Sequence, residues 1–192
     1  DTVDPAAVAE LANAAAQNLA AITGTFAVND ATVGNAITPT VVGSPTVQLN
    51  GLAFTLPAGA AALTAAGAFT LTGATSNGGA TSIGYSYDPA AANLDFLRAG
   101  QSLTVTYTVQ VADGSTTSGT QTVTFTVTGT NDAPVLSDTT DPNAVQELGD
   151  AAAQNLAPIT GSFAVSDLDV GDTLTPAMVG SPVVLLDGGA FT

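Results

Sequence analysis

The sequence contains no cysteine, no histidine and no tryptophan, and Arg98 is its only basic residue. The absence of cysteine excludes disulfides and thiolate metal sites, and the absence of histidine removes the most common general base and transition-metal ligand. A single positive charge is too little to bind a nucleic-acid backbone, and it disfavours an anionic membrane surface. No apolar run reaches about 18 residues, so we expect no membrane insertion.

The missing residue types also argue against catalysis. There is no His or Cys to activate a nucleophile, and neither a GxSxG motif nor a phosphate-binding loop is present. Paired aspartates could serve a glycosidase, but aromatic residues make up only 5% of the chain, too few to favour a sugar-stacking cleft. We therefore expect a protein that is not an enzyme and has no small-molecule substrate.

Acidic residues, in contrast, are abundant and nearly all of one kind. They number 16 against one basic residue, which gives a net charge of −15, and all but Glu10 and Glu147 are aspartate. Aspartate is typical of turns and is a ligand of hard cations, whereas glutamate favours helices. The bias toward aspartate therefore predicts loops that bind calcium.

The strongest positive feature is an internal repeat. The segment 1–55 recurs as the segment 138–192 at a constant offset of 137 positions, without a gap and with 36 identities in 55 positions. We interpret residues 1–137 as one complete unit and residues 138–192 as the first part of a second, truncated unit. Because such a cut leaves apolar strand edges unpaired, we expect a section of a longer array. A duplication inside one domain is the alternative.

Alternating apolar and polar residues predict an antiparallel β-sandwich. Apolar side chains alternate with threonines in two runs joined by a loop that opens with Asp113-Gly114, the pattern of a hairpin with one face in a core. The residues expected to point into that core are Leu103, Val105, Tyr107, Val109, Val123, Phe125 and Val127. Shorter strands separated by turn residues are predicted at 22–28, 37–42, 46–49, 68–72 and 81–87.

Two segments carry helix signals. Asp88-Pro89 can start a helix and Gly100 can end one, which predicts a short helix near residues 89–98. Residues 4–11 also begin like a helix, but Gly149 interrupts the equivalent segment of the second copy, and a sandwich needs a first strand here. We therefore predict an extended edge segment at residues 4–11, with a helix as the alternative.

The turn at residues 167–172 is a candidate calcium loop. Asp167, Asp169 and Asp172 surround a glycine, and calcium takes about six to eight oxygen ligands. A solvated acidic turn is the alternative. The equivalent turn of the first copy keeps only Asp30 of the three aspartates, so a site there should be weaker or absent.

Further oxygen donors lie at the junction between the copies. Asn131 and Asp132 lie in the linker at residues 129–136, whose proline makes it a short, stiff tie. Their alternative role is an Asx turn before that proline. Glu147 could add an oxygen if the chain folds back. The sequence thus predicts a calcium ion near Asp167 and Asp169, with the linker contributing.

The linker also carries a family resemblance. Its sequence GTNDAPV, preceded by LRAGQSLTVTY at residues 97–107 and VADG at residues 111–114, resembles the VCBS-type and cadherin-like tandem repeats of giant bacterial RTX-type surface adhesins. GSFAVSDLDVGD at residues 161–172 is similar to the early strand and acidic turn of that family. The resemblance implies Greek-key, immunoglobulin- or cadherin-like sandwiches strung end to end. It also implies calcium at the junctions, with ligands carried over by position to Asn131, Asp132, Asp167, Asp169, Asp172 and Glu147.

We therefore expect a non-catalytic structural extender, or stalk, of a secreted bacterial adhesin, located at the cell surface or in the extracellular matrix. Its partners would be adjacent repeats or neighbouring copies of the same chain. The alternative is a self-assembling filament or biofilm-matrix subunit completed by strand addition from a neighbouring chain. A mean hydropathy of +0.37 and the unpaired strands of the second copy favour this alternative.

Overall fold

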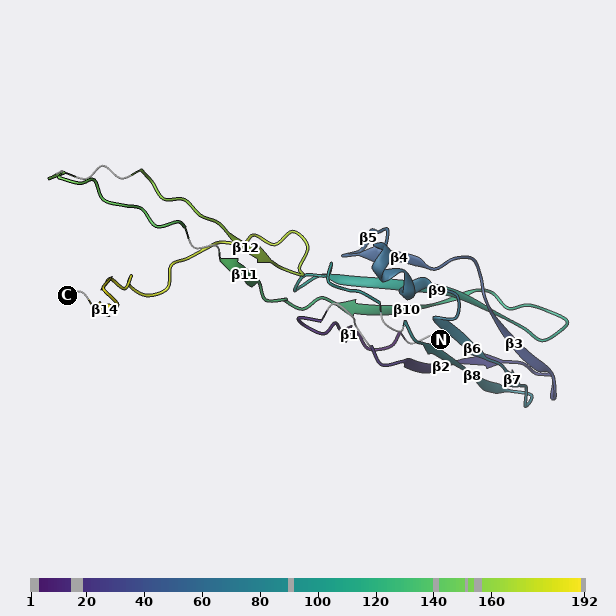
Figure 1. The fold of residues 1–192 in the computed structure, drawn as a ribbon. Helices are drawn as coiled ribbons and strands as arrows, with labels where there is room; N and C mark the ends of the chain where they lie inside the picture. Colours follow the sequence, from purple (N-terminus) through teal and green to yellow (C-terminus); the bar gives the residue numbers. More distant parts are fainter. Residues whose placement is uncertain are drawn as a thin grey trace.

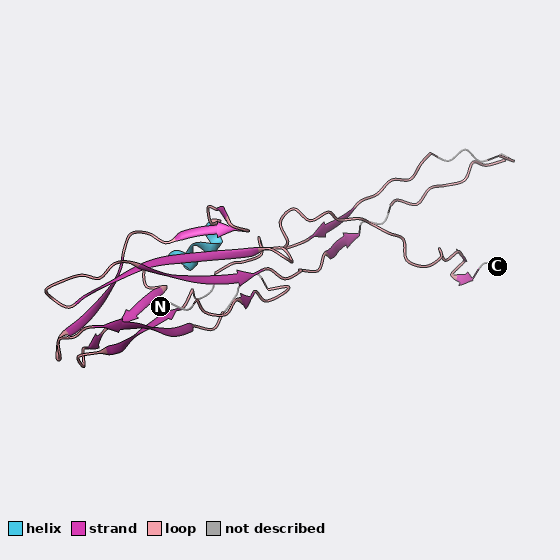
Figure 2. Cartoon of the chain, turned by 180° about the vertical axis from the view of Figure 1, so that it is seen from behind, coloured by secondary structure: helices cyan, strands magenta, loops and turns pink. Residues whose placement is uncertain are grey.

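The computed structural model describes residues 4–14, 19–89, 92–139, 142–150, 152–153 and 157–190. Nearly all regular structure in these residues is β-strand, which confirms the all-β prediction. Two sheets stack in the first unit, and the chain from residue 135 onward leads away from them, so that the molecule is elongated (Figures 1 and 2). Within the described residues, no helix is long and apolar enough to cross a membrane.

The larger sheet is built around one long strand. Its order is β1-β10-β9-β3-β7. The strand β4 pairs with a different part of β9 from the part that pairs with β3, and β4 also pairs with β5. All these pairings are antiparallel except the one between β1 and β10, which corrects the prediction of a purely antiparallel sandwich. The parallel pair arises because the chain enters alongside β10 and then crosses to the other sheet. The bounds are β1 Val8–Ala9, β3 Ala36–Val41, β4 Thr46–Leu49, β5 Leu52–Ala53, β7 Ala74–Thr75, β9 Ser102–Ala112 and β10 Gln121–Thr128.

The smaller sheet has the order β2-β8-β6 and is antiparallel throughout. It comprises β2 (Ile22–Asn29), β6 (Phe69–Thr72) and β8 (Ala80–Tyr87). Its central strand β8 pairs with β2 along all eight residues of both strands. These bounds agree with the predicted strands to within one or two residues, because turns that contain Gly, Pro or Asn end each run of alternating apolar and polar residues.

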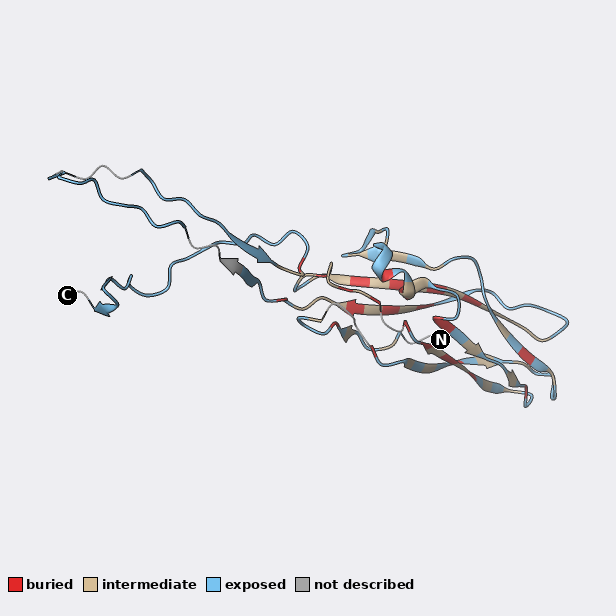
Figure 3. Ribbon diagram, in the orientation of Figure 1, coloured by how far each residue is buried: buried red, intermediate tan, exposed pale blue. Residues whose placement is uncertain are grey.

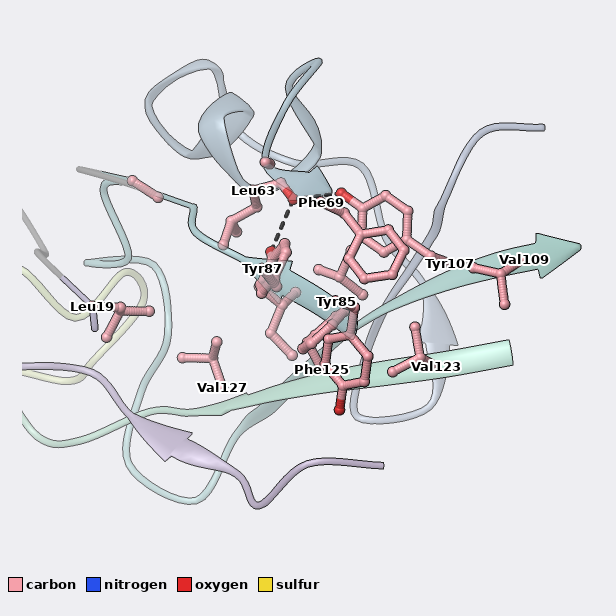
Figure 4. Packing of buried hydrophobic residues seen from close by; sticks show 14 of the residues in the cluster. Leu19, Leu63, Phe69, Tyr85, Tyr87, Tyr107, Val109, Val123, Phe125 and Val127 are labelled. Atoms are coloured by element: carbon pink, nitrogen blue, oxygen red, sulfur yellow. Dashed lines mark hydrogen bonds between the residues drawn. The ribbon is translucent and has the colours of Figure 1, made fainter. Parts of the chain in front are cut away.

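Aromatic side chains join the two sheets. The rings of Tyr87 and Phe125 stack with centroids 4.1 Å apart, and those of Phe69 and Tyr107 with centroids 4.6 Å apart. The hydroxyls of Tyr87 and Tyr107 both donate to the Leu63 carbonyl, at 2.9 and 3.3 Å, which satisfies these polar atoms inside the core (Figure 4). The seven residues predicted to alternate into the core are all buried. Figure 3 shows the buried positions concentrated in the first unit, while the chain beyond the linker is almost entirely exposed.

The predicted helix at residues 89–98 is wrong for its described part, residue 89 and residues 92–98, which contains a turn at residues 95–96 and otherwise no regular structure. The Asn93 side chain accepts a bond from the Asp95 N–H at 3.0 Å, and the Asn93 N–H donates to the Gly59 carbonyl at 2.9 Å. These bonds compete with helix formation. Leu94 and Leu97 are nevertheless buried. A short 3₁₀ helix that was not predicted, η1, occupies Ala58–Thr64.

Residues 4–11 are extended rather than helical, as predicted, and contain β1. This short strand lies at the edge of the larger sheet, next to β10. After β1 the chain continues beside the end of β10, where the Glu10 N–H donates to the Thr128 carbonyl, and then beside the linker, where Asn13 bonds to Asp132 and Ala133.

The second copy reproduces local structure of the first. Its hairpin β13 (Leu185–Leu186) and β14 (Gly189–Ala190) is the counterpart of β4 and β5 at the repeat offset. The turn residues match as well, since Asn50 and Asp187 both have φ of 50°. The remaining strands, β11 (Val135–Thr139) and β12 (Phe163–Ser166), pair with each other. Among the described residues 142–190, however, only Asp169 is buried, so this part has no core of its own.

Candidate metal centre

Three carboxylates from three separate segments meet where the two copies join. Glu10 follows β1, Asp132 lies in the linker after β10, and Asp169 lies in the turn after β12. Each offers an oxygen within 4.8 Å of the others. Their exposed fractions are only 4%, 3% and 2%, which is unusual for acidic residues. We call these residues the acidic trio.

Glu10 is held by the edge of the larger sheet. Its N–H continues the β1–β10 ladder by donating to the Thr128 carbonyl at 3.0 Å. Its Oε1 accepts the Thr130 N–H at 2.8 Å and the Thr130 hydroxyl at 3.4 Å. The carboxylate therefore bridges the first strand of the unit and the start of the linker.

Hydrogen bonds also fix the other two carboxylates. Asp132 Oδ1 accepts the Asn13 N–H, while the Asp132 N–H donates to Asp169 Oδ2 at 2.8 Å. The Asn13 side chain accepts the Ala133 N–H at 2.8 Å, and Asp167 Oδ1 accepts the Asp169 N–H at 3.0 Å. The second copy is thus bonded directly to the linker through Asp169.

One oxygen of Glu10 (Oε2) and one of Asp169 (Oδ1) are buried without a hydrogen-bond partner among the described residues. Burial raises the pKa of Glu10 to about 7, and the charges of Asp132 and Asp169 act in the same direction against the bonds from Thr130. Burial also raises the pKa of Asp169, with Asp132, Asp172 and Asp167 adding to the effect. Both shifts mark carboxylates that lack a compensating positive charge.

The trio fits a hard divalent cation. Two oxygens bound to one calcium ion at about 2.4 Å lie at most about 4.8 Å apart, and the trio meets this limit. All donors are oxygens, which suits calcium rather than zinc or copper. At 4.8 Å and an effective dielectric of about 20, each pair of charged carboxylates repels by roughly 3.5 kcal/mol. A cation would replace this repulsion with attraction and satisfy the two unpartnered oxygens.

The structure brings two of the six predicted ligand residues, Asp132 and Asp169, into the trio. Asp167 lies beside it and bonds the Asp169 N–H. Asn131 is exposed, and its side-chain amide donates to the Asp132 carbonyl at 2.5 Å. Asp172 forms an ion pair with Arg98, and Glu147 is exposed. Neither of these last two belongs to the cluster.

Sequence reasoning missed Glu10, the third member of the trio. A signal was available, because Glu10 and Glu147 are the only glutamates and are separated by the repeat offset. Glutamate at this position of a unit can therefore serve the junction that follows that unit. Glu147 was predicted to bind at the junction that precedes its own unit. At that junction the structure places Glu10, the glutamate of the first unit, instead.

The only basic residue adds a second contact between the copies. Arg98 Nη1 donates to the Gly171 carbonyl at 3.3 Å and to Asp172 Oδ1 at 3.4 Å. The Gly129 N–H donates to the Gln101 carbonyl at 2.9 Å, which anchors the start of the linker to the loop that carries Arg98. The acidic turn of the second copy is therefore held by both the trio and Arg98.

The first copy shows how that turn behaves when these carboxylates are missing. Asp30 Oδ1 accepts the Thr32 N–H at 2.8 Å, and Thr32 stands where the second copy has Asp169. The Gly34 N–H donates to the Ser76 carbonyl at 2.9 Å, so this turn packs within its own unit.

No protein-family model matches the sequence, and no curated protein is significantly similar to it.

Proposed function

We propose that this protein is a non-catalytic structural extender of a secreted bacterial adhesin, in which calcium bound by the acidic trio stiffens the junction between repeat units. The observation that carries the proposal is the trio itself, because its three buried carboxylates belong to the first unit, the linker and the second copy. A cation held there would tie all three segments together.

We extend the proposal to the architecture of the array. Each unit would be a Greek-key, immunoglobulin-like sandwich that recurs at the repeat offset. In support, consecutive strands cross between the two sheets, as when β1 is followed by β2 and β8 by β9. The matching hairpins β4–β5 and β13–β14 also follow the offset. Units joined end to end by a short proline-containing linker would form a rod outside the cell.

The cation would change the mechanics of the junction. Without it, the trio concentrates negative charge between two units that share little packing, because the second copy buries no apolar side chain among its described residues 142–190. With it, ionic bonds would link the linker and the acidic turn to β1. The junction would then resist bending, which is the property that a stalk needs.

Small-angle X-ray scattering and calorimetric titration test the proposal. We expect calcium to bind and to narrow the distribution of molecular dimensions relative to chelator. Asp169→Asn should abolish both effects. The matched control is Asp187→Asn, which changes an exposed aspartate of the same copy to the residue that the first copy carries at Asn50. Identical scattering with calcium and with chelator would reject the stiffening role.

The second candidate function is a self-assembling filament or matrix subunit. Apolar side chains exposed in the linker and the second copy favour it, among them Leu136 at 62%, Phe163 at 53% and Val165 at 44%. Such exposure is typical of surfaces that another polypeptide covers. Sedimentation velocity over a range of concentrations separates the two functions, since a stalk section stays monomeric and a filament subunit elongates.

A further inference from the structure

The acidic turn has the same backbone shape in both copies. Residues 30–35 (DATVGN) and 167–172 (DLDVGD) follow the same succession of bends and turns. In each, the first aspartate accepts the N–H of the residue two positions later, at 2.8 Å from Thr32 and at 3.0 Å from Asp169. The glycine of each turn has a left-handed φ, 88° in the first copy and 90° in the second. The two turns therefore differ in their side chains rather than in their shape.

The turn of the second copy lies against the first unit, where the loop that carries Arg98 meets the linker. We call this part of the first unit and linker the docking surface; it comprises Arg98, Gln101, Asn131 and Asp132. A hollow of about 390 Å³ remains between the docking surface and the turn, lined by Arg98, Gln101 and Asp172, among others. Because the two sides are not closely packed there, directed polar bonds rather than apolar burial hold the turn in place.

Two aspartates of the turn make these bonds. Asp169 Oδ2 accepts the Asp132 N–H at 2.8 Å. Asp172 Oδ1 accepts a bond from Arg98 Nη1 at 3.4 Å, and the same nitrogen donates to the Gly171 carbonyl at 3.3 Å. Within the turn, the Asp172 N–H donates to the Asp169 carbonyl at 3.3 Å, which couples the two contacts. Each bond joins protein atoms directly, so neither contact requires a cation.

The turn of the first copy carries neither aspartate. Thr32 stands at the position of Asp169, and Asn35 stands at the position of Asp172. A threonine oxygen lies closer to the backbone than an aspartate oxygen does, and it carries no charge. Asparagine has the length of aspartate, but its neutral amide forms a weaker hydrogen bond with a guanidinium. A turn of the first type would therefore keep its shape, lose one bond to the docking surface and weaken the other.

We propose that the docking surface is a recognition site for the acidic turn of a following unit, and that Asp169 and Asp172 specify which turns it accepts. It would accept a turn with aspartate at both positions and reject a turn with the threonine and asparagine of the first copy. The proposal shares the repeat organisation of the proposed function, but this recognition needs no calcium. The identity of two side chains would then set which unit follows which along the array.

Charge favours the same partner. Arg98 is the only basic residue against 16 acidic ones, so the turn, with its three aspartates, meets an opposite charge at no other side chain of the sequence. The ion pair of Arg98 with Asp172 is partly exposed, at 41% and 32% for the two side chains. Salt screens such a pair, which contributes selectivity more than strength. High ionic strength should therefore weaken docking when no cation is bound.

Amide hydrogen exchange at Asp132 measures docking on the full chain in chelator, because this N–H is bonded to the following unit. Asp169→Thr, which introduces the residue of the first copy, should speed this exchange at least about tenfold, as expected for loss of a hydrogen bond to a charged group. Asp172→Asn should speed it about two- to fivefold, the range of exposed ion pairs. The Ala133 N–H, bonded to Asn13 at 2.8 Å, is the internal reference and should change little.

Asp187→Asn is the matched control, because it changes an exposed aspartate of the same copy to the first-copy residue. Its Asp132 amide should exchange as in the unmodified chain. Arg98→Asp combined with Asp172→Arg should restore much of the protection lost in either single variant, which a purely structural role of the two residues would not produce. Fast exchange of Asp132 in the unmodified chain, equal exchange in Asp172→Asn and Asp187→Asn, or no rescue by the exchanged pair would each overturn the proposal. The calcium experiments can fail without changing these outcomes, because no cation is present here.

Discussion

Glu10→Gln should raise stability in chelator and remove most of the stabilisation that calcium provides. Above pH 7 and without calcium, the Glu10 charge repels those of Asp132 and Asp169, and each such pair costs roughly 3.5 kcal/mol at an effective dielectric of about 20. Glutamine removes both repulsions, while its amide oxygen can still accept the Thr130 N–H. The variant should therefore melt at a higher temperature than the unmodified chain in chelator.

With calcium the difference in melting temperature between the two chains should narrow, because calcium stabilises the unmodified chain more than the variant. A calcium concentration of a hundred times Kd stabilises the unmodified chain by about 2.7 kcal/mol, or roughly 5–11 °C in melting temperature for a chain of this size. Loss of one of three carboxylates that weakens binding a hundredfold would leave only about 0.4 kcal/mol at the same concentration, a shift of about 1–2 °C.

Differential scanning calorimetry at pH 8 measures the melting temperatures of the unmodified chain and of Glu10→Gln, each with chelator and with calcium. Asp30→Asn is the control, because Asp30 lies in the equivalent turn of the first copy and outside the trio. Its calcium-induced shift should match that of the unmodified chain. The reasoning fails if calcium leaves the melting temperature of the unmodified chain unchanged, or if Glu10→Gln retains the full shift.

Three further predictions concern pH, the linker and the core. Since folding raises the pKa of Glu10 from 4.5 to about 7, its contribution to stability in chelator is complete below about pH 4.5 and is lost as the pH rises through 7. Urea denaturation from pH 4.5 to 8 should show this fall, and Glu10→Gln should reduce it. Gly129→Ala would place a Cβ atom 2.2 Å from the Arg98 carbonyl oxygen, and overpacking of this kind costs about 1–3 kcal/mol in urea unfolding; a neutral result would contradict this geometry. Phe125→Ala should cost about 3–5 kcal/mol in the same assay, because its buried ring packs against rings of both sheets; a loss below about 1 kcal/mol would argue against that packing.

Local sequence predicted most of the fold of the first unit. Strands such as β4 and β9 could be placed because side chains alternate between two faces of a sheet, so that burial on one face produces a period of two in the sequence. The helix predicted at residues 89–98 is wrong in its described part, because its starting signal is local, whereas the bond from Asn93 to Gly59 is not. A local pattern carries no information about such long-range partners.

The sequence by itself determined the alternation of the strands, the repeat with its constant offset and the abundance of aspartate in turns. Only the tertiary structure decided which carboxylates meet. Glu10 and Asp132 are far apart in the sequence, and they come together because β1 pairs with β10 at the sheet edge. Asp169 joins them through its bond to the linker, while Asp172 turns to Arg98. Proximity across a sheet depends on register and pairing, and neither is written in the spacing of residues along the chain.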